Sequence, residues 1–181
     1  MKVKYDNGEI EEFYAFHQFL DRVNYDNIIE INCKNCDLIL LPDKLPSNLE
    51  VLICCMNKLT GLPDLPSSLR LLNANFNQLY LLPELIHTNL EELYVSKNNL
   101  EVIPELPQTL QMLFVLNNDI TALPKELPPN LDSLFFDWDK MKSIPSSIMK
   151  LDKLNNIHLI KDDNLFIDPE IKKWLNERFD F

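Results

Sequence analysis

The sequence predicts an α/β solenoid, a right-handed superhelix in which short parallel strands form a sheet on the concave side. Three observations predict this fold. Prolines recur at a nearly fixed interval, the residues between them repeat one pattern of aliphatic side chains and asparagine, and the prolines exclude an ordinary helix from the convex side. The 181 residues are enough for one domain with its own core.

The interval is seen in the first proline of each unit. These prolines lie 20 or 21 residues apart, at Pro42, Pro63, Pro83, Pro104, Pro124 and Pro145. The accompanying frame L-x-x-L-x-L-x-x-N-x-L starts at Ile28, Leu49, Leu69, Leu90, Leu110, Leu131 and Leu154. The last unit is longer and ends at Leu165. Because one unit cannot bury its own leucines, we expect seven units to stack around a shared core.

Within each unit, the aliphatic residues at the fourth and sixth positions alternate as in a short strand with one buried face. The asparagine follows where the chain must turn away from that strand. We expect these side chains to form a structural ladder that hydrogen-bonds otherwise unpaired backbone groups of neighbouring turns. Its members are Asn57, Asn77, Asn98 and Asn118. The L-P-x-L-P segments predict extended, polyproline-like backbone on the convex side, with their leucines directed inward.

These residues resemble the leucine-rich-repeat proteins, and specifically the short class with L-P-x-L-P on the convex side. That class is known from the YopM and IpaH group of bacterial secreted effectors, and similar repeats occur in giant-virus proteins. The resemblance covers about residues 28–165 and implies a leucine-rich-repeat superhelix. IpaH relatives carry a separate ubiquitin-ligase domain with a C-x-D motif, but no cysteine here is followed by aspartate two residues later. The resemblance therefore does not extend to that enzyme.

The two ends predict caps that cover the terminal units. Residues 1–27 predict a capping strand and turn followed by a helix within 9–24, because apolar residues recur there at helical spacing: Phe13, Phe16, Leu20 and Val23. Residues 166–181 predict a capping helix that begins at Asp168 and Pro169. Its apolar stripe consists of Ile171, Trp174, Leu175 and Phe179. An alternative role for the amino-terminal helix is to bind a second partner.

The charge balance restricts the partners. There are 17 basic and 28 acidic residues, a net charge of −11, which disfavours binding to nucleic acids and anionic membranes. With two glycines in the chain, a glycine-rich phosphate loop is excluded. The amino terminus lacks the apolar core of a signal peptide, and no segment reaches the ~18 apolar residues of a membrane span. We expect a cytoplasmic protein, in the host cytoplasm if the source is a pathogen or a virus.

The four cysteines raise the question of a zinc site. In the repeat frame, Cys33 and Cys54 occupy the aliphatic sixth position, Cys36 occupies the asparagine position, and only Cys55 is expected on the open face. A structural role with reduced thiols explains three of the four. The acidic residues Asp137, Asp139, Asp162 and Asp163 raise a similar question for calcium. We predict no metal and no cofactor. We also predict no catalytic residue, because His158, the histidine that could activate Cys55 as a nucleophile, is five strand spacings, ~24 Å, away from it.

The candidate site is the open, concave face. The third, fifth and seventh positions of each unit are expected to point there, and several of them are apolar although the fold does not require it. The candidate residues are Ile53, Leu71, Tyr94, Met112, Phe114, Leu116, Phe135, Trp138 and His158. This patch and its acidic surroundings predict a non-catalytic module that binds a protein with an apolar centre and a basic rim. The alternative is a self-associating structural protein that uses the patch as a homodimer interface, or a patch covered by an end segment.

Overall fold

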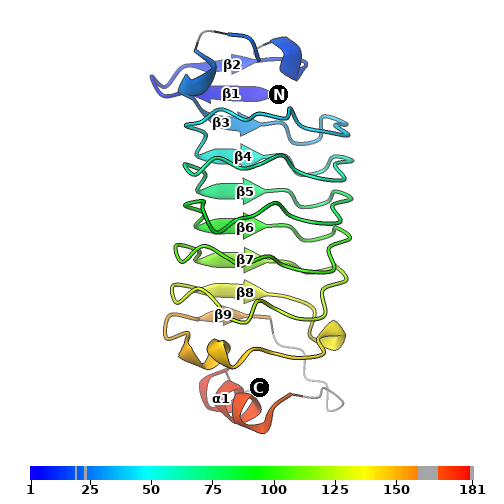
Figure 1. Ribbon diagram of the computed structural model, residues 1–181, viewed down its shortest axis with the longest axis vertical. Coiled ribbons are helices and arrows are strands. Elements are labelled where there is room, and N and C mark those ends of the chain that lie inside the picture. The colour runs from blue at the N-terminus through cyan, green and yellow to red at the C-terminus, as the bar shows by residue number, and fades with distance from the viewer. Residues whose placement is uncertain (19, 23, 159–166, 180–181) are drawn as a thin grey trace.

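The computed structural model describes residues 1–18, 20–22, 24–158 and 167–179. Its turns stack into an elongated solenoid with one sheet along its length (Figure 1). Within the described residues, the strands follow the order β2-β1-β3-β4-β5-β6-β7-β8-β9. The repeat strands are β3 (Ile28–Asn32), β4 (Val51–Ile53), β5 (Leu71–Asn73), β6 (Glu92–Tyr94), β7 (Met112–Phe114), β8 (Ser133–Phe135) and β9 (Asn156–Ile157). They pair in parallel from β3 to β9, which confirms the predicted solenoid.

The core lies directly behind this sheet. The fourth-position residues of neighbouring units are paired in register, as Leu72 with Leu93 and Leu93 with Leu113. All three are fully buried, and each such burial is worth about 1.5–3 kcal/mol. The residues on either side of each central leucine point the other way and are half-buried. The twofold alternation of the sequence therefore sets which side chains face the core.

The asparagines join successive turns. Asn98 Nδ2 donates to the carbonyl oxygen of Val95 in its own unit at 3.0 Å and to that of Ala74 in the preceding unit at 3.1 Å. Its Oδ1 accepts the N–H of Leu79 at 3.0 Å. Equivalent bonds are made at Asn57, Asn77 and Asn118. Each side chain thus satisfies buried backbone groups of two turns at once.

The turn before each of these asparagines needs left-handed backbone. The residues immediately preceding them have positive φ, at Met56 (59°), Phe76 (56°), Lys97 (57°) and Asn117 (56°). Glycine would adopt this conformation without steric cost, whereas other residues lose about 1–2 kcal/mol. The regular hydrogen bonding of the following asparagine holds the turn despite this cost.

The convex side consists of extended segments and turns. The second proline of a unit accepts a hydrogen bond from the leucine that opens the next unit, as in Leu69 N–H to the Pro66 carbonyl oxygen at 3.0 Å and Leu110 N–H to that of Pro107 at 3.1 Å. The sixth unit lacks the L-P-x-L-P sequence and instead forms the 3-10 helix η4 (Ser146–Lys150). The prolines therefore predict correctly where this side is not helical.

The predicted amino-terminal helix is wrong. Residues of that segment instead form β2 (Ile10–Glu12), paired antiparallel with β1 (Lys2–Tyr5), and β1 pairs antiparallel with β3. Two short 3-10 helices follow, η1 (Phe16–Gln18) and η2 (Tyr25–Asn27). The antiparallel pairing of β2 with β1, which itself covers the open edge of β3, outweighs helical periodicity here, because unpaired strand edges leave backbone groups without partners. The predicted position Val23 lies outside the described residues.

At the other end, the capping helix α1 (Pro169–Phe179) is present as predicted. The Asp168 carboxylate accepts the N–H of Glu170 at 2.8 Å and so caps its first turn. Ile171 and Leu175 are buried, while Trp174 and Phe179 pack edge to face with ring centroids 5.8 Å apart. The predicted positions of the seventh unit beyond His158, including Asp162, Asp163 and Leu165, lie outside the described residues.

Candidate functional site: the strand face

The outward side of β3 to β9, here called the strand face, carries most of the candidate residues. The strands β6 and β7 each have the burial pattern half-buried, buried, half-buried. Their parallel register places Tyr94 beside Phe114 and Phe114 beside Phe135. Because neighbouring strands are about 4.8 Å apart, side chains at equivalent positions must stack. The short strands therefore bring residues some 20 positions apart in sequence into contact.

The stack is an aromatic ladder of Tyr94, Phe114, Phe135 and His158. The Phe114 and Phe135 rings are nearly parallel, with centroids 4.4 Å apart and planes 8° from each other. Tyr94 lies 5.0 Å from Phe114, and His158 lies 6.2 Å from Phe135. All four side chains are half-buried. Their faces are used in contacts with one another, so the ladder offers ring edges to a ligand.

Tyr94 is held in place at the start of the ladder. Its hydroxyl donates to the Glu92 carboxylate at 2.6 Å and lies 3.4 Å from the sulfur of Met112. Burial, assisted by the hydrogen bond and charge of Glu92, raises the pKa of Tyr94 to about 12. The tyrosine therefore remains a neutral hydrogen-bond donor at physiological pH.

The other aliphatic candidates flank this ladder. Met112 lies on β7 with Phe114, and Leu116 follows two residues after the end of that strand. Both side chains are half-buried. Ile53 and Leu71 are half-buried on β4 and β5. Asn73 pairs with both Ile53 and Tyr94 across the sheet and so separates Ile53 from the ladder in its column. The structure thus divides the predicted patch into a smaller aliphatic group and a larger aromatic one.

Trp138 is a correction to the predicted site, because it is fully buried rather than exposed on the strand face. In the sixth unit the asparagine is replaced by Asp139, and the turn becomes the 3-10 helix η3 (Trp138–Lys140). This directs the indole inward, where it packs on Phe136 with centroids 4.4 Å apart and donates its N–H to the His158 carbonyl oxygen. Trp138 closes the core where the asparagine ladder stops.

The acidic residues around the ladder differ in availability. The Asp137 carboxylate accepts the backbone N–H of Asn117 at 2.6 Å, and the Glu92 carboxylate accepts the Tyr94 hydroxyl. Glu30, at the amino-terminal end of the same face, is half-buried and makes no ion pair within the described part of the chain. The negative rim predicted from the sequence is therefore partly used in structural hydrogen bonds.

The cysteines are placed largely as the repeat frame predicts. Cys33 and Cys54 are fully buried in the core, and burial raises the pKa of the Cys33 thiol to about 12 and that of the Cys54 thiol well above its ordinary value. Cys55, expected on the open face, is instead buried, and burial also raises its pKa. Metal binding requires thiolates, which these environments disfavour. Across the described ranges, no three histidine, cysteine or acidic side chains gather as a metal site would require.

One surface was missed by the sequence reasoning. Large apolar side chains that are more than half exposed follow the asparagine turn in three units: Ile39, Leu40, Tyr80, Leu81 and Val102. They lie outside the strand positions on which the prediction was based. Writing out the twelfth and thirteenth positions of each unit would have revealed them, because these positions are apolar in some units and polar or small in others.

The in-register strands, asparagine turns and proline-containing returns define a solenoid of short leucine-rich units. Among solved structures, the chain is similar to a Shigella effector LRR domain, with 30% identity over 82% of this chain and 74% of that one and a TM-score of 0.61. It is also similar to a Leptospira interrogans LRR protein (23% identity, 86% of this chain, 54% of that one, TM-score 0.57) and to the leucine-rich effector YopM of Yersinia pestis (27%, 77%, 50%, TM-score 0.49). The chain belongs to the leucine-rich-repeat proteins.

The chain spans about half the length of the Leptospira and Yersinia proteins. No protein-family model matches it, and no curated protein sequence does. Among the described residues, no helix combines the length and the apolar character that crossing a membrane requires.

Proposed function

We propose that the protein is a non-catalytic binding module that holds a protein partner on its strand face. The observation that carries the proposal is the aromatic ladder. The fold does not require rings in this column, since Asn32 and Asn73 occupy the same column in other units and are also half-buried. Aromatic residues are the usual carriers of binding energy at protein interfaces, and a cluster on an otherwise polar sheet supports such a role.

The partner that fits this face has an apolar centre and a basic rim. Its apolar side chains would pack against Phe114, Phe135 and the neighbouring Met112, which together span two adjacent units. Basic groups would be attracted by Glu30 and by the net charge of −11. The likeness to an effector LRR domain supports a further proposal, that the module acts on a host protein. The four free thiols support action in a reducing compartment such as the cytoplasm.

The test replaces the ladder and measures capture. Phe114→Asp combined with Phe135→Asp should fold normally, because both side chains are half-buried and outside the core, but should lose its partner. The control is Ile10→Asp with Tyr14→Asp, which makes the same charge change at exposed residues of the amino-terminal cap. Proteins captured by each bait are quantified, and one that is lost only with the ladder variant is purified and titrated directly. Equal capture by both variants would contradict the proposed face.

Self-association through the same face is separated by light scattering. The proposed module is a monomer at low and high concentration in the absence of its partner. A dimer that the ladder variant abolishes would replace the proposal with the structural alternative, in which the patch joins two copies.

A further inference from the structure

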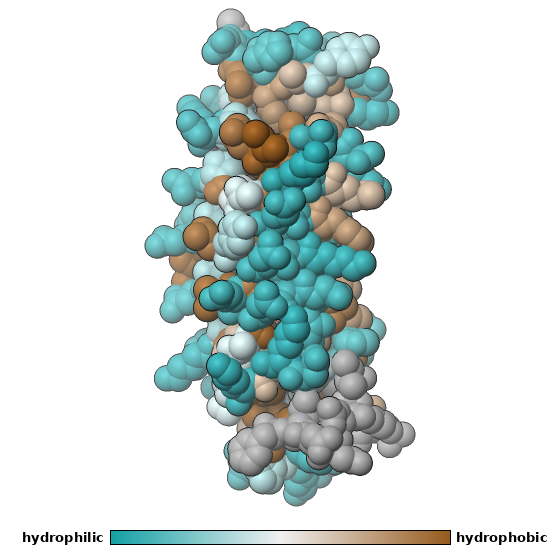
Figure 2. All heavy atoms as spheres, turned by 90° about the vertical axis from the view of Figure 1, so that its right-hand side faces the viewer, coloured by the Kyte–Doolittle hydropathy of each residue, from teal (hydrophilic) through white to brown (hydrophobic). Residues whose placement is uncertain are grey.

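A second surface lies on the flank of the solenoid, where the chain leaves the asparagine turn. Its first component is an apolar column of Ile39, Leu40, Tyr80, Leu81 and Val102, whose side chains are 59–66% exposed. The return segments that carry it are bonded to one another, as in Gln78 N–H to the Leu59 carbonyl oxygen at 2.8 Å and Asn99 N–H to that of Leu79 at 2.9 Å. Figure 2, which faces the edge where the repeat strands end, shows hydrophobic side chains at its upper end and beside a hydrophilic band.

The fold does not require apolar residues in this column. The equivalent positions are Thr60 and Gly61 in the second unit, Thr121 and Ala122 in the fifth, and Lys142 and Ser143 in the sixth. Ala122 and Ser143 even form a parallel bridge there, so polar and small residues support the same backbone. Large exposed apolar side chains at such positions indicate an interaction surface rather than a structural need.

The second component is an acidic column. The residue directly after the first proline is acidic in four successive units, at Asp43, Asp64, Glu84 and Glu105. All four are exposed, and none is in an ion pair with another described residue. The fifth unit has Lys125 at this position. The acidic column therefore runs through the first four units, the apolar column occupies the first, third and fourth of them, and both end at the fourth.

The two columns are close enough to contact one ligand. Glu84 follows Leu81 by three positions, and Glu105 follows Val102 by three positions. An extended segment of that length reaches at most about 10 Å. The two columns therefore run beside each other in the first, third and fourth units, and the acidic column alone continues through the second.

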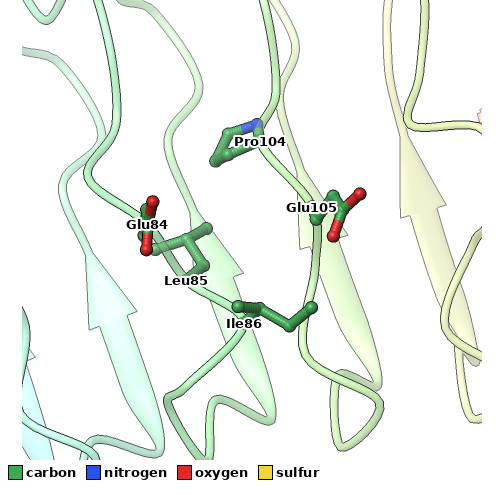
Figure 3. A pocket seen from close by; sticks show the side chains of 5 residues that line it. All are labelled: Glu84, Leu85, Ile86, Pro104 and Glu105. Carbon is green, nitrogen blue, oxygen red and sulfur yellow. The ribbon is translucent and has the colours of Figure 1, made fainter.

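A shallow hollow opens within the acidic column. It has a volume of about 280 Å³ and is lined by Glu84, Leu85, Ile86, Pro104 and Glu105. Figure 3 shows the two glutamates on adjacent turns, with the Ile86 side chain extending from its own turn toward the next. Ile86 is 55% exposed and stands where neighbouring units have a proline. The hollow offers an apolar floor with a carboxylate on either side.

We propose that the two columns form a second docking surface, for an amphipathic helix of a partner protein that carries an aliphatic stripe flanked by lysines or arginines. Successive helical turns are 5.4 Å apart and successive units about 4.8 Å, so three turns match four units. The aliphatic stripe packs on the apolar column. The stem of one lysine or arginine lies in the hollow, with its charge between Glu84 and Glu105. A second copy of this chain fits poorly, because it brings the same net charge of −11.

The experiment uses the full chain and a synthetic probe. The probe is a fluorescent 14-residue helical peptide with leucines on one stripe and lysines beside it, compared with a scrambled peptide of the same composition and with a version carrying glutamates for lysines. We expect the probe alone to bind, and its Kd to rise when salt is raised from about 50 to 300 mM. Leu40→Ser with Leu81→Ser should weaken binding at least about tenfold, and Glu84→Gln with Glu105→Gln at least about fivefold.

Two control variants make the result specific. Glu170→Gln with Glu177→Gln makes the same charge change on exposed residues of α1, and Phe114→Ser with Phe135→Ser alters the strand face; both should bind the probe as the unaltered chain does. Equal weakening by a control, no weakening by the flank variants, or equal binding of the scrambled peptide would overturn the proposal. So would a dimer in light scattering that Leu40→Ser with Leu81→Ser dissolves. Unchanged thermal unfolding of each variant excludes misfolding as the cause.

Discussion

Replacing Asn98 by alanine tests the mechanism that joins the turns. The Leu79 N–H is bonded to Asn98 Oδ1 and would be left buried without that partner, which costs about 1–3 kcal/mol. The carbonyl oxygens of Ala74 and Val95 each lose one of two side-chain amide donors, because Asn77 and Asn118 bond them as well. These weaker losses add about 0.5–1.5 kcal/mol each. We expect Asn98→Ala to lower the free energy of unfolding by about 2–6 kcal/mol.

The matched control is Asn73→Ala on the strand face. Asn73 is half-buried, and its side chain accepts one long bond of 3.3 Å from the N–H of Asn75. Its removal should cost less than about 0.5 kcal/mol. Both variants are unfolded in urea and followed by circular dichroism, and the slopes with denaturant must agree for the midpoints to be compared. Equal midpoints for Asn98→Ala and Asn73→Ala would refute the claim that the asparagine ladder stabilises the stack of turns.

Three further predictions concern individual side chains. Trp138→Ala should lower the free energy of unfolding by about 3–5 kcal/mol, well beyond the cost of Phe114→Ala, because only the tryptophan is fully buried; chemical denaturation measures both. Burial raises the pKa values of Tyr25 and Tyr94 to about 12, so both should ionise late in an ultraviolet titration, and Tyr94→Phe should remove one of these late groups. In the unfolded chain the same side chains ionise near pH 10. The stability that they contribute is therefore present below pH 10 and is lost as the pH rises to about 12. Met56→Asn should raise the melting temperature, because asparagine tolerates φ of 59° better than methionine does; an unchanged or lower value would contradict the strain argument.

The repeat scaffold could be predicted from sequence because its signals are local and recur. The aliphatic frame sets which side chain of each strand is buried, as at Leu93, and the prolines mark where no helix forms, as at Pro66. Because the same pattern occurs in every unit, each unit independently supports the prediction. The aromatic column was predictable for the same reason, since the register of parallel strands follows from the repeat itself.

The amino-terminal end and the irregular units could not be predicted in the same way. Phe13 and Phe16 have helical spacing, but the residues just before Phe13 form β2 and pair with β1, and Phe16 lies in η1; such long-range strand pairing leaves no local signal. Trp138 turns inward because the asparagine turn is replaced by η3, a change that the aligned frame does not reveal. Cys55 is buried although its position in the frame points outward. In each case tertiary packing outweighs the local pattern.

The nearly identical bonding of Asn77 and Asn98 also bears on how such a protein can change its length. Each asparagine contacts only its own turn and the adjoining one, so a whole unit can be inserted or excised without altering the bonds of the others. Each insertion or excision would add or remove the exposed side chains that one unit contributes to a binding surface. Reach along a partner is thus adjustable in increments of about 4.8 Å, while the architecture behind it stays the same.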